Sequence, residues 1–232
     1  MIKNTRIALA FRLCAIIFAM VGVLKQIGVF EGRTALSAFM FYTLLSNLLA
    51  IILFAFLTVR TIMIIRDDSH DSLGRYTRLE MVCAVDLLVT LVVFWVLLAP
   101  VVEPAYLWTF DNIAVHTVTP LLCLLDYILF SEAGRLKYRD VYYVCIFPLA
   151  YVLFTSIAGL LGYTYSFSST FGNAGVIDTA PVRFPYFFLD FDRIGFMALA
   201  YIGVMLAFFI LIAHVLYFLD RKVRQKTPTS KY

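Results

Sequence analysis

Long apolar stretches alternate with short polar connections along the chain, and this pattern predicts the secondary structure. Six stretches stay apolar for about 20 residues, the length that an α-helix needs to cross the hydrocarbon core of a bilayer. We therefore expect an all-α protein, a six-helix transmembrane bundle that forms a single domain over residues 1–232. The predicted spans are Ile7–Leu24, Leu36–Val59, Leu79–Val101, Asn112–Phe130, Val141–Tyr163 and Ile194–Leu219.

The composition agrees with an integral membrane protein. Hydrophobic residues make up 62% of the chain and charged residues 15%, whereas soluble domains are about 45–50% apolar and about 25% charged. The net charge of +4 is small and lies in the connections. It indicates membrane topology and contact with anionic lipid headgroups, and it argues against a nucleic-acid partner.

The distribution of basic residues predicts the orientation. All but four of the 19 Lys and Arg residues fall near the termini or in the connections after the second and fourth spans. The positive-inside rule then places both termini in the cytoplasm, which an even number of spans requires. The longest connection, Thr164–Arg193, faces outside and is expected to cap the outer end. The four remaining basic residues are Lys25, Arg33, Arg183 and Arg193.

The fourth predicted span carries ionisable residues at membrane depth, which are costly there and indicate function. His116 lies about 6 Å from the start of this span, at 1.5 Å per residue. Pro120 lacks the N–H that would bond the carbonyl of residue 116, so the helix should be loosened at the histidine. Asp126 lies about 15 Å further along and about 80° around the helix, so it does not orient the imidazole.

The second predicted span begins with a polar face of Thr43, Ser46 and Asn47, which are three and four residues apart. One interpretation is that these side chains bond helices together. The other makes Thr43, about 10 Å deep in the same outer third as His116, a nucleophile activated by a base. Ser46 or Asn47 would then stabilise the oxyanion. Thr119 and Asp190 are further candidate substrate contacts.

A second polar level is expected deeper in the membrane. Asp86 in the third span and Asp126 in the fourth both lie toward the cytoplasmic third. They form either a proton relay, as in transporters, or a structural pair with a basic residue or a hydroxyl.

Metal and haem sites are not predicted. Apart from His116, the histidines are His70, in a connection, and His214, at the cytoplasmic end of the last span, so no facing pair exists. The four cysteines lie in apolar runs without a CxxC pair and are expected to be buried thiols. They are Cys14, Cys83, Cys123 and Cys145.

Three segments together resemble a known family: FYTLLSN in the second span, HTVTP with DYILF in the fourth, and FPYFFLD before the sixth. They are similar to a bacterial family of small six-helix membrane proteins. That family distantly resembles the eukaryotic androgen-induced and androgen-dependent membrane hydrolases, which are threonine hydrolases that cleave fatty-acid esters of hydroxy fatty acids. Their pair is a Thr early in the second helix and a His in the fourth, and it matches Thr43 and His116.

The resemblance implies a lipid hydrolase of the bacterial plasma membrane, with membrane lipids as partners, a fatty-acyl ester as substrate and no cofactor. The chain departs from the hydrolases in the Ser-Asn pair that follows Thr43 and in Asp126. FPYFFLD itself is interpreted as an interfacial aromatic belt or as the lid of a lipid pocket.

We therefore predict an intramembrane threonine hydrolase with Thr43 as nucleophile and His116 as base. The alternative is a transporter or lipid-binding protein without catalysis, in which Asp86 and Asp126 form the ion site. A structural partner subunit and a homo-oligomer are also compatible with the sequence.

Overall fold

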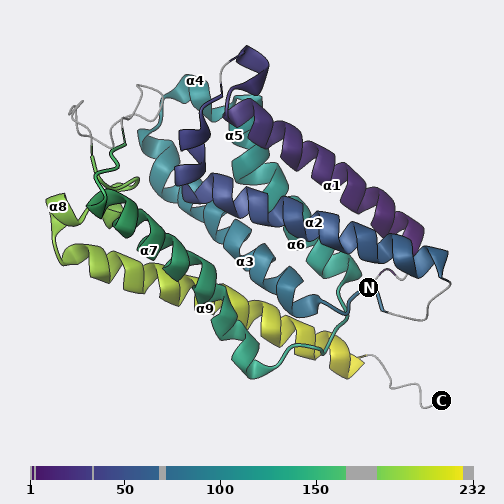
Figure 1. Cartoon of the computed structure of the whole chain (residues 1–232). Coiled ribbons are helices and arrows are strands. Elements are labelled where there is room, and N and C mark those ends of the chain that lie inside the picture. The colour runs from purple at the N-terminus through teal and green to yellow at the C-terminus, as the bar shows by residue number, and fades with distance from the viewer. Residues whose placement is uncertain (1, 3, 33, 68–71, 166–181, 227–232) are drawn as a thin grey trace.

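A computed structural model describes residues 2, 4–32, 34–67, 72–165 and 182–226, and within them the chain is almost entirely helical (Figure 1). Six helices are long and apolar enough to cross a membrane. The described residues contain no β-strand, only one isolated bridge between Tyr165 and Val182. The prediction of an all-α protein with six membrane-spanning helices is therefore confirmed.

Three of the spans are interrupted helices. The third continues into a π-helical turn, the fourth has a π-helical segment in its middle, and the fifth begins as a 3₁₀-helix. In order, the spans are α1 (Thr5–Gln26); α2 (Tyr42–Arg66); α3 (Thr77–Val93) with the turn Phe94–Leu98; α5 (Phe110–Ile113), the π-segment Ala114–Val118 and α6 (Thr119–Phe130); the 3₁₀-helix Tyr138–Cys145 with α7 (Ile146–Leu160); and α9 (Met197–Lys226).

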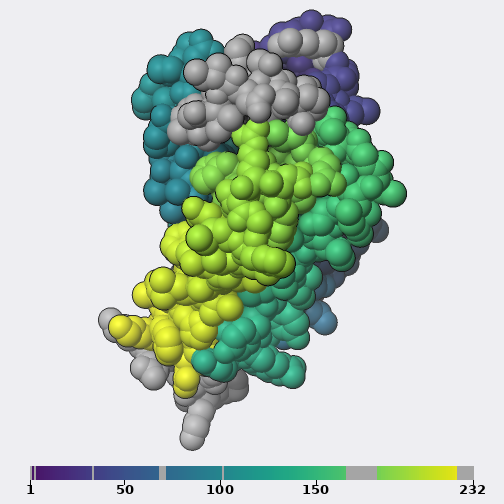
Figure 2. All heavy atoms as spheres, turned by 90° about the vertical axis from the view of Figure 1, so that its left-hand side faces the viewer, coloured from purple at the N-terminus to yellow at the C-terminus, as the bar shows by residue number. Residues whose placement is uncertain are grey.

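The helices pack so that α3 and α6 lie at the centre of the bundle (Figure 1). α1 packs along α2, and α9 contacts the 138–145 helix and α3. Figure 2 looks onto the side of the molecule where α7 and α9 form the surface. Both termini lie at one end of the bundle, and the short helices α4 (Pro104–Leu107) and α8 (Phe191–Ile194) lie at the other.

The second helix begins later than its hydropathy predicts. Residues Leu36–Met40 form a separate 3₁₀-helix, and Phe41 is extended, with φ −94° and ψ 141°. α2 therefore starts at Tyr42, and Thr43 is the second residue of the helix. The predicted start of the second span at Leu36 was therefore wrong, because residues 36–41 do not continue the helix.

Two glycines set helix boundaries that the hydropathy misses. Gly162, with φ +89°, follows the end of α7 at Leu160, and Gly195, with φ +55°, separates α8 from α9. A left-handed backbone ends a helix, and glycine adopts it without a Cβ clash. The predicted fifth span therefore ended too late, at Tyr163, and the predicted sixth span began too early, at Ile194.

Much of the expected outer cap, residues 164–193, lies outside the described residues. At its described ends, backbone hydrogen bonds of 2.7 and 3.1 Å join Tyr165 and Val182. Of the cysteines, Cys83 and Cys123 are buried with their Sγ atoms 3.5 Å apart, but Cys14 is exposed. Cys145 is half-buried. The expectation that all four thiols are buried was therefore wrong for Cys14 and for Cys145.

Candidate functional site

Thr43 and His116 come together in the bundle, although 73 residues separate them. The Thr43 Oγ1 lies 3.2 Å from the His116 Nε2. Both side chains are buried, with 7% of Thr43 and 4% of His116 exposed. A hydroxyl within hydrogen-bond distance of an imidazole is the arrangement that nucleophilic catalysis requires.

The other ring nitrogen fixes which atom of His116 carries the proton. His116 Nδ1 lies 3.2 Å from the Asn112 carbonyl oxygen, which only accepts, so Nδ1 is the protonated nitrogen. In the neutral ring Nε2 then has a free lone pair and accepts from the Thr43 hydroxyl. The Phe94 ring stacks on the imidazole at 3.8 Å between centroids and holds its plane.

A break in the helical hydrogen bonding of the fourth span accompanies the histidine. In the π-segment, the Thr119 N–H donates to the Ala114 carbonyl, five residues back. The next N–H would serve the Val115 carbonyl, but Pro120 has none. The free carbonyl is therefore that of Val115, and the predicted position 116 was wrong by one residue because a π-turn shifts the bonding by one.

Asn47 fills the gap that the proline leaves. Its Nδ2 donates to the Val115 carbonyl at 2.9 Å and to the Thr43 carbonyl at 2.8 Å. One amide thus ties the first turn of α2 to the π-segment, which brings Thr43 and His116 into register. Both donors of Asn47 are occupied, so the predicted role in binding an oxyanion does not fit this geometry.

The remaining predicted contacts lie elsewhere. Ser46 Oγ donates to the Thr43 carbonyl at 3.0 Å and lies 3.3 Å from Thr90 Oγ1. Asp190 caps α8 by accepting from the Asp192 and Arg193 N–H groups.

Thr119 is fully buried and does not line the cavity next to Thr43. Ser46 and Asp190 do not line this cavity either.

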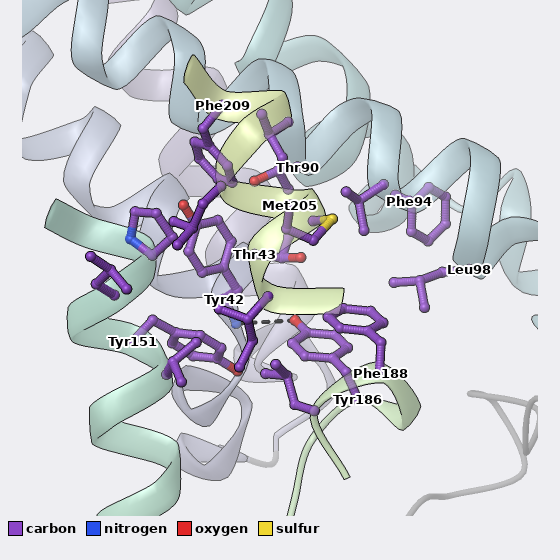
Figure 3. A pocket seen from close by; sticks show the side chains of 18 residues that line it. Tyr42, Thr43, Thr90, Phe94, Leu98, Tyr151, Tyr186, Phe188, Met205 and Phe209 are labelled. Carbon is purple, nitrogen blue, oxygen red and sulfur yellow. Dashed lines mark hydrogen bonds between the residues drawn. The ribbon is translucent and has the colours of Figure 1, made fainter. Parts of the chain in front are cut away.

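Tyr186 is a site residue that the sequence did not identify. Its hydroxyl oxygen accepts from the Tyr42 N–H at 3.1 Å, at the N-terminus of α2 (Figure 3). The Tyr186 hydroxyl thus lies at the first turn of α2, next to Thr43.

Tyr186 stays protonated at neutral pH. Burial raises the pKa of its hydroxyl to about 12, and hydrogen bonds that its oxygen accepts from backbone N–H groups offset part of this rise. It belongs to FPYFFLD, and the sequence showed an aromatic run there but not which ring turns inward.

An apolar cavity opens beside Thr43 (Figure 3). Its volume is about 80 Å³. Its walls come from α2, α3, α7, α9 and the segment before α8. No charged side chain lines it among the described residues, and its polar members are Tyr42, Thr43, Thr90, Tyr151 and Tyr186.

The deeper polar level divides into two places. Asp126 forms a two-point ion pair with Arg12, with Nε–Oδ1 at 2.8 Å and Nη2–Oδ2 at 3.2 Å. Asp86 is fully buried near the Tyr42 hydroxyl instead. The two aspartates do not share one site.

Arg12 and Glu80 complete the Asp126 cluster and were missed. Arg12 was counted among the cytoplasmic charges, but it is 1% exposed inside α1. Its Nη1 donates to Thr61 Oγ1 at 2.8 Å, and its Nη2 lies 3.4 Å from Glu80 Oε1. Arg12 lies five residues after the predicted start of the first span, and this position in the sequence could have identified it as a buried residue.

The described residues contain no group of three or more His, Cys, Asp or Glu side chains that could hold a metal ion. No family model, no curated protein and no solved structure matches the chain. Its function therefore has to be inferred from the site itself.

Proposed function

We propose that the protein is an intramembrane hydrolase of lipid esters that uses Thr43 as its nucleophile. The observation that carries the proposal is the Thr43–His116 contact of 3.2 Å at the wall of an apolar cavity. A hydroxyl is a weak nucleophile unless a base takes its proton. His116 presents an unprotonated Nε2 to this hydroxyl because its Nδ1–H is held by the Asn112 carbonyl.

In the first half-reaction, the Thr43 proton passes to His116 Nε2 while Oγ1 attacks the ester carbonyl carbon. The carbonyl π electrons move to oxygen and give a tetrahedral oxyanion. On collapse the bond to the alcohol oxygen breaks, and the leaving alkoxide takes the proton from Nε2. The products are an acyl-threonine and the free alcohol.

The oxyanion would lie at the N-terminus of α2. Tyr186 offers a protonated hydroxyl there, polarised by the Tyr42 N–H. Helix N-termini favour negative charge because their first N–H groups are unpaired. Tyr186 thus takes the role that we predicted for Ser46 or Asn47.

The second half-reaction repeats the chemistry with water. His116 accepts a proton from water, which attacks the acyl carbon, and Thr43 Oγ1 leaves and regains the proton. The sum is ester plus water giving acid plus alcohol. Every proton in this scheme is moved by His116, so it needs no cofactor.

The substrate class follows from the cavity and its surroundings. An uncharged, apolar lining suits the acyl chain of a neutral ester. α7 and α9 both line the cavity, and they make few backbone contacts with each other, so a lipid would enter between them from the bilayer. These features support the resemblance to the androgen-induced and androgen-dependent hydrolases, with a bacterial plasma membrane as location.

The test is labelling of the purified protein with an alkyl fluorophosphonate, followed by intact mass and peptide mapping. We expect one adduct on Thr43, lost in His116→Ala and in Thr43→Ala. The matched control is Thr90→Ala, which removes another hydroxyl of the same cavity but should keep the adduct. A folded protein that neither a short nor a lipid-like probe labels would overturn the proposal and favour the transporter or ligand-binding alternative.

A further inference from the structure

Asp86 is a buried carboxyl group near the middle of the third span, and the hydrolase proposal does not use it. The span runs from Thr77 to Leu98, so Asp86 lies about 14 Å of helix from one end and about 18 Å from the other. Its side chain is fully buried. The hydrocarbon core supplies no water at this depth to solvate a charge.

Neither oxygen of the Asp86 carboxyl has a hydrogen-bond partner among the described residues, and no basic side chain of those residues lies beside it. The other buried carboxyl groups in the described ranges each have a cation or an N–H group as partner. These groups are Glu80 and Asp126 with Arg12, Asp140 with Arg78, Asp190 with Arg193, and Asp220 with the Gly134 N–H. Asp86 therefore differs from all of them.

The titratable groups near the Asp86 carboxyl are uncharged. The Tyr42 hydroxyl lies near it, but not at hydrogen-bond distance and angle. Cys123 of α6 and Cys145 at the end of the 138–145 helix also lie near it. α9 packs on α3 as well, but its described residues bring no charge to Asp86. Phenols and thiols keep their protons at neutral pH, so none of these groups balances a negative charge.

A proton is the cation that fits these surroundings. An unpaired carboxylate is too costly at membrane depth, and such a group takes up a proton instead. Asp86 belongs to no group of three or more described His, Cys, Asp or Glu side chains that could hold a metal ion. An organic cation would need space beside the carboxyl, and Asp86 does not line the cavity. A proton needs neither additional ligands nor space.

The carboxyl lies one helical turn from the apolar cavity beside Thr43. Val89, Thr90 and Val93 of α3 line this cavity. They follow Asp86 by three, four and seven residues, and so they lie on the same face of the helix. Tyr42 lies between the two places, because it lines the cavity while its hydroxyl lies near Asp86. Asp86 is therefore at the inner end of the cavity, on the side of the termini.

We propose that Asp86 binds an exchangeable proton at the inner end of the cavity. With the proton bound, this end is as uncharged as the rest of the lining. When the proton leaves, a negative charge lies one turn from Thr90, and the cavity becomes less favourable for an apolar occupant. The site is a single carboxyl and not a relay with Asp126, whose charge is balanced by Arg12. It does not depend on the hydrolase proposal.

The experiment measures the infrared absorption of the full chain at neutral pH in bilayers of ether-linked lipids, which have no ester carbonyl. A protonated carboxyl has a C=O stretching band that a carboxylate lacks. We expect such a band, with one component lost in Asp86→Asn, a variant that keeps the shape of the neutral acid. In heavy water this component should shift, because deuterium replaces an exchangeable proton.

The matched control is Asp140→Asn, which removes a similarly buried carboxylate that Arg78 balances and should leave the band unchanged. A band from which Asp86→Asn removes nothing would overturn the proposal, because Asp86 would then be ionised beside another cation. A component that does not shift in heavy water would also overturn it, since the proton would not exchange. Thr43→Ala should keep the Asp86 component while it abolishes fluorophosphonate labelling, so the two proposals fail separately.

Discussion

At the scale of single residues, the site is a set of hydrogen bonds that crosses three segments. The Tyr42 N–H donates to the Tyr186 oxygen, the Thr43 hydroxyl donates to His116 Nε2, and the His116 Nδ1–H donates to the Asn112 carbonyl. The lone pair of His116 Nε2 therefore faces the Thr43 hydroxyl, which needs a base to become a nucleophile.

Tyr186→Phe should lower kcat for ester hydrolysis by about 10²–10³-fold, the effect of losing one oxyanion donor, and change KM little. Labelling of Thr43 should slow as well. The control is Tyr165→Phe, which removes a buried hydroxyl without a hydrogen-bond partner among the described residues. A fall in kcat of the same size in both variants would argue against a specific role for Tyr186.

Asn47→Leu should destabilise the protein by about 1–3 kcal/mol, because it leaves the Val115 carbonyl buried and unpaired. Ser46→Ala, whose hydroxyl bonds a carbonyl of its own helix turn, should cost about 0.6 kcal/mol or less. Thermal unfolding in detergent measures both. If both variants lost the same stability, the link that Asn47 makes between α2 and the π-segment would not contribute to stability.

At the scale of helices, the packing of α1 against the π-segment keeps His116 in place. A Cβ added at Gly22 would lie 2.7 Å from Ala114 Cβ and 3.5 Å from a Val115 methyl. The first distance is shorter than any normal contact, so one of the two elements has to move. Glycine at this position is thus required by close packing between two spans.

Gly22→Ala should lower Thr43 labelling, since it displaces the π-segment, and should destabilise the bundle by about 1–3 kcal/mol. Gly203→Ala on α9 is the control, because a Cβ there meets nothing within 4 Å. The control should be neutral or stabilising by up to about 1 kcal/mol. Labelling and unfolding midpoints of both variants check this, and unchanged labelling in Gly22→Ala would contradict it.

At the scale of the whole molecule, one buried charge cluster joins four helices. Arg12 of α1 reaches Thr61 of α2, Glu80 of α3 and Asp126 of α6. Ser131 donates to the far oxygen of Glu80. Since no water is available at this depth to replace a lost partner, the cluster fixes how these four helices are placed.

Arg12→Met should destabilise the protein by about 3–5 kcal/mol, because two carboxylates remain buried without their cation. The triple variant Arg12→Met/Glu80→Leu/Asp126→Leu should recover most of this loss, as apolar replacements of buried ion pairs often do. Unfolding midpoints in detergent measure both. The recovered triple variant should still be labelled at Thr43, whereas an ion site at Asp126 would make it inactive in transport.

The six-helix architecture follows from the sequence alone. Six apolar runs of about 20 residues have one stable form in a bilayer, the helix, because every backbone group has to be paired internally. The same physics made polar groups at membrane depth conspicuous, and this is why Thr43, His116 and Asn47 were identified as candidates. The helix boundaries were less accurate, because hydropathy does not register a 3₁₀ turn at residues 36–40 or a glycine with positive φ at 195.

The contacts of each polar residue, in contrast, became known only from the folded structure. Asn47 was a candidate oxyanion donor until its two N–H groups were seen on carbonyls, and Arg12 was a topology signal until it was seen beside Asp126. Tyr186 is one of several rings in an aromatic run, and only packing turns its hydroxyl onto the Tyr42 N–H at the start of α2. The physical reason is that hydropathy is a property of one segment, whereas a hydrogen bond depends on angle and distance between segments far apart in the chain.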